Sequence, residues 1–194
     1  MKYKATLTGE PIMIRETVLI AKYVIKGSSL DKNLLNKLED ENAFQYKTLK
    51  SYPKRFNAIK KRLEALDPSL IQYISNSSAK IPELIIAWSI IKTQPIVKDF
   101  FYLFISEKFN KKDLSLSIKD VSFFIGERMK VISEIEGWTE FTQKKINLQL
   151  RRIIEEIGIL KDSTLSKIML DKESKGVLTS LDSEIDTFLK IVTY

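Results

Sequence analysis

Seven basic side chains stand close together in FQYKTLKSYPKRFNAIKKRL, residues 44–63, which contains no Asp or Glu. Lysine supplies a mobile point charge and arginine a planar fork of N–H donors, and both suit phosphate oxygens. Each phosphate that such a surface neutralises releases counterions, so binding weakens as salt rises. The segment therefore predicts a phosphate-binding surface.

The competing interpretation is an ordinary solvated helix face, since charge runs are common on amphipathic helices. Ordinary faces mix signs and gain from Glu–Lys pairs four residues apart, which this segment lacks almost entirely. The chain carries 32 basic and 25 acidic residues, a net charge of +7, and the segment alone supplies 7. The remaining 25 basic and 25 acidic residues cancel, so the excess is local and favours a nucleic-acid patch.

A helix from about residue 51 to 65, with Pro53 in its first turn, would orient these side chains. Phe56, Ile59 and Leu63, followed by Leu66, share one stripe and are expected to face the core. The nucleic-acid candidates on and before this helix are Lys47, Lys50, Lys54, Arg55, Asn57, Lys61 and Arg62.

A second basic stretch lies in GWTEFTQKKINLQLRRIIEEIGIL, residues 137–160. Ile146, Leu150 and Ile153 form its apolar stripe. The secondary nucleic-acid candidates outside that stripe are Lys144, Lys145, Arg151 and Arg152. A small hairpin is expected within 158–170, where two apolar runs flank KDST, so this part could form a winged-helix-like unit. A core helix with a mixed-sign face is the favoured alternative.

The chain has no Cys and no His, which excludes disulfides, Cys/His zinc sites and His-based proton transfer. The acidic clusters and Glu173-Ser174-Lys175 do not make a convincing metal-dependent nuclease site. No glycine-rich phosphate loop is present. We therefore expect no enzymatic activity, no metal and no cofactor.

The wider chain is predicted to be all-α, with the hairpin as its only sheet. Glycine and proline are scarce, at 6 and 5 residues, whereas helix-forming residues are plentiful. Helices are expected at 12–26, 29–41, 51–65, 69–75, 81–92, 95–109, 117–135, 139–157 and 181–192. The helices at 29–41 and 51–65 would form a helix-turn-helix-like pair. Two helical lobes are predicted, covering 1–112 and 113–194.

The most membrane-like stretch, residues 84–105, is interrupted by Lys92, Pro95, Lys98 and Asp99. Spanning a bilayer takes ~20 apolar residues, so this stretch is interpreted as two core helices that meet at Pro95, with no membrane partner. No targeting segment is recognised, and the absence of Cys fits a cytoplasmic location. No surplus apolar stripe is left for a second copy, so we expect a monomer.

Three blocks carry a family resemblance: YKATLTGEP, ENAFQYKTLKSYPKRFNAIKKRLEALD and GWTEFTQKKINLQLRRIIEEIGILKDS. In this order they resemble the BrxA family, small proteins of bacteriophage-exclusion (BREX) defence systems, over nearly the whole chain. The resemblance implies a small, mainly helical, non-enzymatic cytoplasmic protein that is likened to the RNA-binding protein NusB and binds DNA. The family's basic block corresponds to Lys47, Lys50, Arg55, Asn57 and Arg62, and Pro53 departs from the expected pattern.

We therefore expect a DNA-binding accessory protein of BREX defence that contacts mainly duplex phosphates, with little sequence specificity. Two alternatives remain open. The protein could dock an acidic surface of another BREX component, or it could bind RNA as NusB does.

Overall fold

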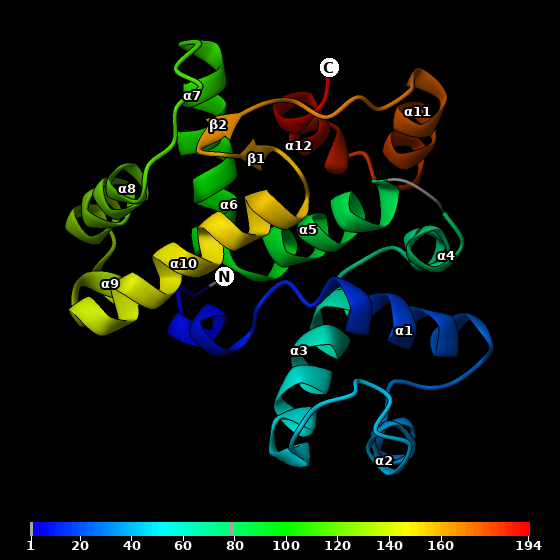
Figure 1. Cartoon of the computed structure of the whole chain (residues 1–194). Helices are drawn as coiled ribbons and strands as arrows, with labels where there is room; N and C mark the ends of the chain where they lie inside the picture. The colour runs from blue at the N-terminus through cyan, green and yellow to red at the C-terminus, as the bar shows by residue number, and fades with distance from the viewer. Residues whose placement is uncertain (1, 78–79) are drawn as a thin grey trace.

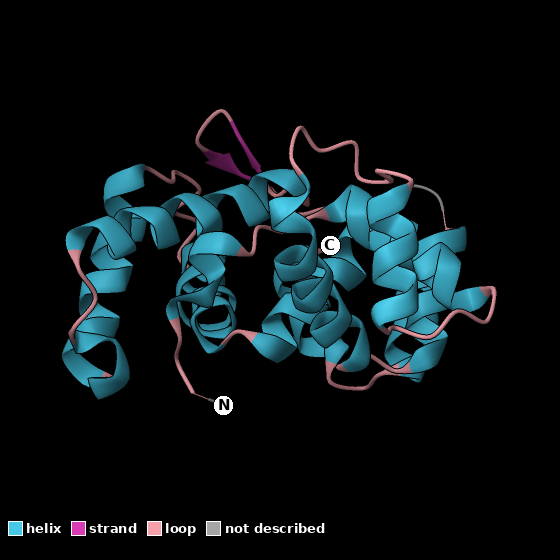
Figure 2. Cartoon of the chain, turned by 90° about the horizontal axis from the view of Figure 1, so that it is seen from below, coloured by secondary structure: helices cyan, strands magenta, loops and turns pink. Residues whose placement is uncertain are grey.

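The structure, a computed structural model, describes residues 2–77 and 80–194. It is mainly helical (Figures 1 and 2). The helices are η1 (Ala5–Gly9, 3₁₀), α1 (Ile14–Ile25), α2 (Lys32–Asp40), η2 (Leu49–Ser51, 3₁₀), α3 (Tyr52–Glu64), α4 (Pro68–Asn76), α5 (Ile81–Thr93), α6 (Pro95–Asp99), η3 (Phe100–Ile105, π), α7 (Ser106–Asn110), α8 (Ile118–Val131), α9 (Ser133–Glu136), α10 (Glu140–Glu156), α11 (Lys172–Leu181) and α12 (Ile185–Val192). The strands are β1 (Leu160–Lys161) and β2 (Thr164–Leu165), and the expected all-α class is confirmed.

Helix α5 lies at the centre of the molecule (Figure 1). Every residue from Leu84 to Ile91 is buried, so this helix is apolar on all sides, as a fully enclosed helix must be. It packs against α1, α3, α4 and α6. The expectation that residues 84–105 form two core helices meeting at Pro95 is confirmed, because α6 begins at that proline.

Helix α3 presents its predicted apolar stripe to the core. Phe56, Ile59 and Leu63 are buried, and Pro53 lies in the first turn, where no intrahelical N–H bond is lost. Helix α1 ends at Ile25, one residue before the predicted end, and is followed by Gly27, whose φ of 92° is easily reached only by glycine. The Gly27 and Ser28 N–H groups close that helix end by donating to Val24 and Tyr23 carbonyls.

The segment predicted as one helix over 95–109 is helical throughout but changes type. Phe100–Ile105 winds as a π-helix between the α-helical segments α6 and α7. The π turn leaves Phe100 and Phe101 buried while Leu103 stands half exposed. The hydrophobic pattern cannot distinguish π from α winding over so short a stretch, so the prediction missed it.

The C-terminal third differs from the prediction in three places. The helix expected over 117–135 breaks at Ile132 into α8 and α9, and the last helix begins at Ile185. Helix α11 was not predicted, because its sequence KESKGVLTSL is polar and contains Gly176. The expected hairpin is present as an antiparallel pair in which Leu160 faces Leu165.

No helix in the described part of the chain is both long and apolar enough to cross a membrane. The buried side chains form one continuous cluster that runs from Leu7 to Val192. The predicted boundary between residues 112 and 113 falls in the turn between α7 and α8. The division into two lobes, the helix-turn-helix-like pairing and the winged-helix-like unit stay predictions.

Candidate nucleic-acid interface

The outer face of α3 carries the exposed part of the basic segment. Lys54, Asn57 and Lys61 are exposed there, and Lys47 and Lys50 are exposed just before the helix. Only Lys60 of this segment's lysines forms an ion pair with a described residue, with 3.7 Å between its Nζ and a Glu64 oxygen. The remaining ammonium groups are therefore available for an external anion.

The N-terminal segment lies beside this face and is anchored by its own side chains. Leu7 is fully buried, and the Tyr3 hydroxyl donates to Asp99 at 2.7 Å. The Thr6 hydroxyl and the Gln94 side chain also exchange hydrogen bonds, at 3.2 and 3.0 Å. The ammonium end of Lys54 lies directly over Gly9 of η1. The hydrogen bonds fasten residues 2–9 to Gln94 and Asp99, where α5 gives way to α6, and Lys54 of α3 lies beside them.

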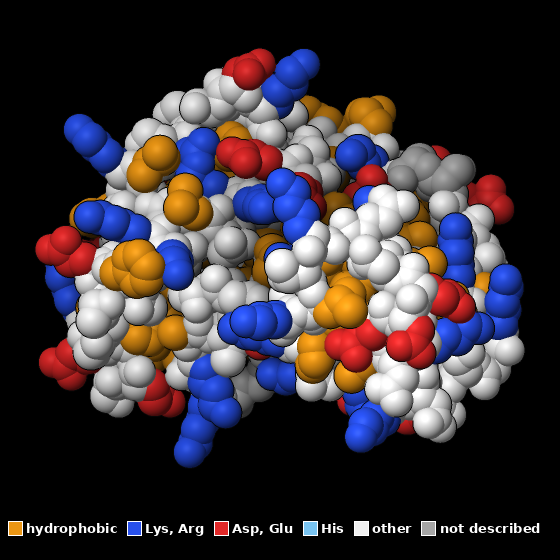
Figure 3. All heavy atoms as spheres, turned by 60° about the horizontal axis from the view of Figure 1, so that its bottom comes forward, with side chains coloured by type: hydrophobic (Ala, Val, Ile, Leu, Met, Phe, Trp, Pro, Cys, Tyr) orange, Lys and Arg blue, Asp and Glu red, His pale blue; other side chains and the backbone are white. Residues whose placement is uncertain are grey.

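The two segments together line an open cleft of about 470 Å³. Lys61 contributes from α3, and Lys2 and Lys4 contribute from the N-terminal segment. Lys92 also reaches the cleft, but its ammonium group is paired with Asp182 at 3.0 Å. Figure 3 shows Lys and Arg side chains gathered around the middle of the face that comes forward from the bottom of Figure 1.

Arg62 must be removed from the nucleic-acid candidates, because its side chain is buried at 1 % exposure. Its guanidinium donates to three backbone carbonyls, those of Glu10 at 2.7 Å, Pro11 at 2.8 Å and Ile12 at 3.1 Å. Burial lowers the pKa of Arg62 to about 10, so it stays charged at neutral pH. Arg62 fastens the turn between η1 and α1 to α3, which is a structural role.

Arg55 lies on the same flank of α3 but remains partly accessible, with 32 % of its side chain exposed. Its Nη1 donates to the Tyr46 hydroxyl at 2.8 Å and lies 3.8 Å from a Glu16 carboxylate oxygen. Tyr46 donates in turn to Glu16 at 2.5 Å. Burial and this bond to Glu16 raise the pKa of the Tyr46 hydroxyl, so it keeps its proton.

The secondary candidates on α10 are largely engaged within the protein. Arg151 is mostly buried and donates to the Leu116 carbonyl at 3.1 Å. Lys144 lies 3.7 Å from Glu140, and Lys145 stacks over the Phe141 ring at 4.2 Å. Arg152 is 60 % exposed and donates its Nε to Glu156 at 2.5 Å. These four side chains do not form one continuous basic face.

Sequence reasoning missed Lys2 and Lys4. Nothing in their local sequence links them to Lys61, because the link runs through the Tyr3 and Thr6 anchors to residues near 94–99. Within the described residues, no three His, Cys, Asp or Glu side chains are grouped to hold a metal ion. Glu173-Ser174-Lys175 lies in α11 and not on a strand.

Comparison with known proteins shows the family and the fold of the chain. The model of a protein family described as BrxA matches residues 1–182. The chain belongs to the BrxA family. A curated relative from Bacillus cereus (strain H3081.97), named "BREX protein BrxA", is 26 % identical over 160 residues, which cover 82 % of this chain and 80 % of the relative.

A second curated relative with the same printed name, from Paramagnetospirillum magneticum (strain ATCC 700264 / AMB-1), is 22 % identical over 180 residues, 93 % of this chain and 90 % of the relative. A crystal structure of an uncharacterized protein from Magnetospirillum magneticum matches with a TM-score of 0.78 at 20 % identity. The match covers 96 % of this chain and 97 % of that one. At this identity the likeness establishes the shared fold.

Proposed function

We propose that this BrxA-family protein is a component of a BREX phage-defence system that binds double-stranded DNA through the backbone phosphates. The observation that carries the proposal is the acid-free segment 44–63, whose exposed lysines Lys47, Lys50, Lys54 and Lys61 form no ion pair with any described residue. Glu64, at the end of α3, pairs with Lys60. The contacting set is Lys47, Lys50, Lys54, Asn57 and Lys61, joined by Lys2 and Lys4, with Arg55 at its margin.

The composition of this surface favours contacts to phosphates over the reading of bases. Base recognition relies on bidentate pairs, which arginine, asparagine and glutamine form best. After the removal of Arg62, the exposed set is mostly lysine, which acts as a point charge. We therefore propose that the protein binds DNA with low sequence specificity. We further propose that it acts as a non-catalytic monomer in the cytoplasm.

Fluorescence anisotropy over a salt series tests the proposal. Labelled duplex DNA, single-stranded DNA and RNA of equal length would each be titrated with the protein. We expect the duplex to bind most tightly, with an affinity that falls linearly with salt on logarithmic axes. Absence of saturable duplex binding near physiological salt would contradict the proposal. Tighter binding of RNA than of duplex DNA would identify RNA as the ligand instead.

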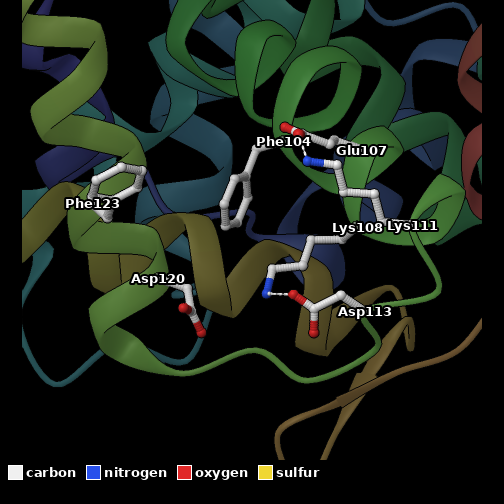
Figure 4. Close-up of a pocket in the computed structure, with 7 residues that line it drawn as sticks. All are labelled: Phe104, Glu107, Lys108, Lys111, Asp113, Asp120 and Phe123. Atoms are coloured by element: carbon white, nitrogen blue, oxygen red, sulfur yellow. Dashed lines mark hydrogen bonds and ion pairs between the residues drawn. The ribbon is translucent and has the colours of Figure 1, made fainter.

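A second candidate function is the docking of another BREX protein, and a separate surface favours it. A groove of about 230 Å³ runs between η3 and α8. The close-up of the neighbouring pocket shows Phe104 and Phe123 on facing sides, with Lys108 held by Asp113 (Figure 4). Phe123 is 68 % exposed and Leu103 is 49 % exposed, and because both line the same groove they form an exposed apolar patch, which is typical of an interaction surface.

The two functions predict different effects of the same variants. Phe123→Ser should leave duplex affinity unchanged, and it should weaken a complex with a purified BREX component if the groove is the docking surface. Size-exclusion chromatography of each BREX component mixed with the wild-type protein or with Phe123→Ser would show which complexes form. Retention of every complex by the variant would exclude the groove.

A further inference from the structure

A second positively charged recess lies beside α3, on the flank of that helix that carries Arg55. The cleft measures about 500 Å³ and opens where the first turn of α1 meets α3 and α10. Three arginines line it, one from each helix: Arg15 from α1, Arg55 from α3 and Arg152 from α10. Such a convergence of guanidinium groups from segments far apart in the chain is produced only by the fold.

Much of the donor capacity of these arginines is uncommitted. Arg15 is exposed and forms no ion pair with any described residue. Arg152 gives only its Nε to Glu156, and Arg55 uses only Nη1, for Tyr46. Each guanidinium carries five N–H donors in one plane, so most of these N–H groups remain available to the oxygens of a ligand.

Two carboxylates also face the cleft, and both are already paired. Glu16 accepts from Tyr46 and lies beside Arg55, whereas Glu156 accepts from Arg152. Three arginines and two glutamates leave a local charge of +1. Helix α1 adds a positive end here, because its N-cap residue Met13 provides no side-chain hydrogen bond to the first-turn N–H groups.

We propose that this arginine cleft binds one phosphate ester group. Its volume falls within the range of small-molecule sites, about 300–1,000 Å³, so it admits a group the size of a mononucleotide. The same chemistry has two sources, a backbone phosphate of bound DNA or a free nucleotide. The first of these rests on the proposed function, whereas the second is independent of it.

The arginine side-chain Nε–H resonances of the full chain provide a direct readout. The sequence contains six arginines, so each signal can be assigned by substitution. Titration with inorganic phosphate and with AMP should shift the signals of Arg15, Arg55 and Arg152 in a saturable way. Arg128, which is paired with Asp99 outside the cleft, is the internal control and should not shift.

Arg15→Gln should weaken AMP binding by about tenfold or more, because it removes a charged donor to the phosphate. The fold should tolerate this change, since Arg15 forms no ion pair with any described residue. Lys119→Gln, an equal charge change at an exposed position of α8, should not. Shifts that fail to saturate, equal shifts at Arg128, or unchanged affinity in Arg15→Gln would overturn the proposal.

Addition of unlabelled duplex to the AMP complex separates the two sources. Displacement of AMP by duplex assigns the cleft to a DNA phosphate, and simultaneous binding assigns it to a free phosphate ester. Either result supports the cleft as a phosphate site. Because the AMP titration contains no DNA, its failure overturns the arginine cleft alone, whereas absence of duplex binding with intact AMP shifts contradicts only the proposed function.

Discussion

Arg55 and Arg62 lie two helical turns apart on one flank of α3, yet their environments are opposite. Arg62 is enclosed and donates to three carbonyls of the η1–α1 turn, whereas Arg55 borders an open cleft. The sequence places both on the same side of the helix and cannot tell which one is covered. The turn that covers Arg62 is formed by residues 10–12, some fifty positions earlier in the chain. The sequence around Arg62 therefore does not indicate that it is buried.

The buried role of Arg62 leads to a prediction about stability. Arg62→Ala would leave the Glu10, Pro11 and Ile12 carbonyls without their charged donor, so the free energy of unfolding should fall by at least about 3 kcal/mol. Lys61→Ala, at the exposed neighbouring position, should change it by no more than about 0.5 kcal/mol. Urea unfolding followed by circular dichroism measures both, and an Arg62→Ala protein of wild-type stability would refute the structural role.

A second residue-scale prediction concerns Asp182, which links the C-terminal helices to α5. One of its oxygens accepts from the Trp88 indole at 2.8 Å and from Lys92 at 3.0 Å. Burial alone would raise the pKa of Asp182, but these hydrogen bonds and the charge of Lys92 outweigh it and lower the pKa below its ordinary value. The stabilisation is therefore present above the unfolded-state pKa and is lost as pH falls through the folded-state pKa.

Asp182→Asn should accordingly be less stable than the wild type by about 1–3 kcal/mol at pH 7. The difference should begin to shrink as pH falls below the unfolded-state pKa of an aspartate, about 3.9, and should vanish once pH has passed through the lower pKa of the folded state. Urea unfolding of both proteins at a series of pH values checks this. A difference that stays constant down to pH 2 would show that the charge of Asp182 is not responsible.

At the scale of the element, one glycine is required by its backbone conformation at a helix end, and another lies inside a helix where alanine would also fit. Gly27 has a φ of 92° and ends α1, whereas Gly176 lies inside α11 with open space around its Cα. Gly27→Ala should therefore lower the free energy of unfolding by about 1 kcal/mol, and Gly176→Ala should raise it by about 0.5–1 kcal/mol. Thermal unfolding measures both variants. Changes in stability of the same sign would contradict the different roles given to the two glycines.

Elements with a strong period were predictable, and polar or irregular ones were not. Phe56, Ile59 and Leu63 repeat at helical spacing, and tertiary packing agreed with that local pattern. Helix α11 has no comparable stripe and is held by contacts with α12 and α4, which the sequence does not display. The π turn over Phe100–Ile105 packs against α12 and the η1 turn packs against α10, and these distant contacts are not visible in the local sequence.

At the scale of the whole molecule, the distribution of charge matters more than its total. The net charge follows from the sequence, and helical geometry alone places Lys54, Asn57 and Lys61 on one face of α3. The completion of that face by Lys2 and Lys4 depends on how the N-terminal segment lies across the fold, with Tyr3 fastened to Asp99. The arginine cleft also required the fold, because α1, α3 and α10 meet only in three dimensions.

The central claim is that the α3 face, and not the overall positive charge, binds DNA. Two triple variants with the same change in net charge distinguish binding by the α3 face from binding through the overall positive charge. The first, the α3 triple, carries Lys61→Gln on the α3 face together with Lys47→Gln and Lys50→Gln just before that helix. The other carries Lys119→Gln, Lys161→Gln and Lys172→Gln at exposed positions on other elements.

The decisive measurement is the salt dependence of duplex affinity for the wild type and both triple variants, by anisotropy. Because each neutralised phosphate contributes about 0.9 to the slope, the α3 triple should reduce its magnitude by about 2–3 and weaken binding strongly. The other triple should keep a slope close to that of the wild type. Equal losses in both triples, or no loss in the α3 triple, would contradict the account.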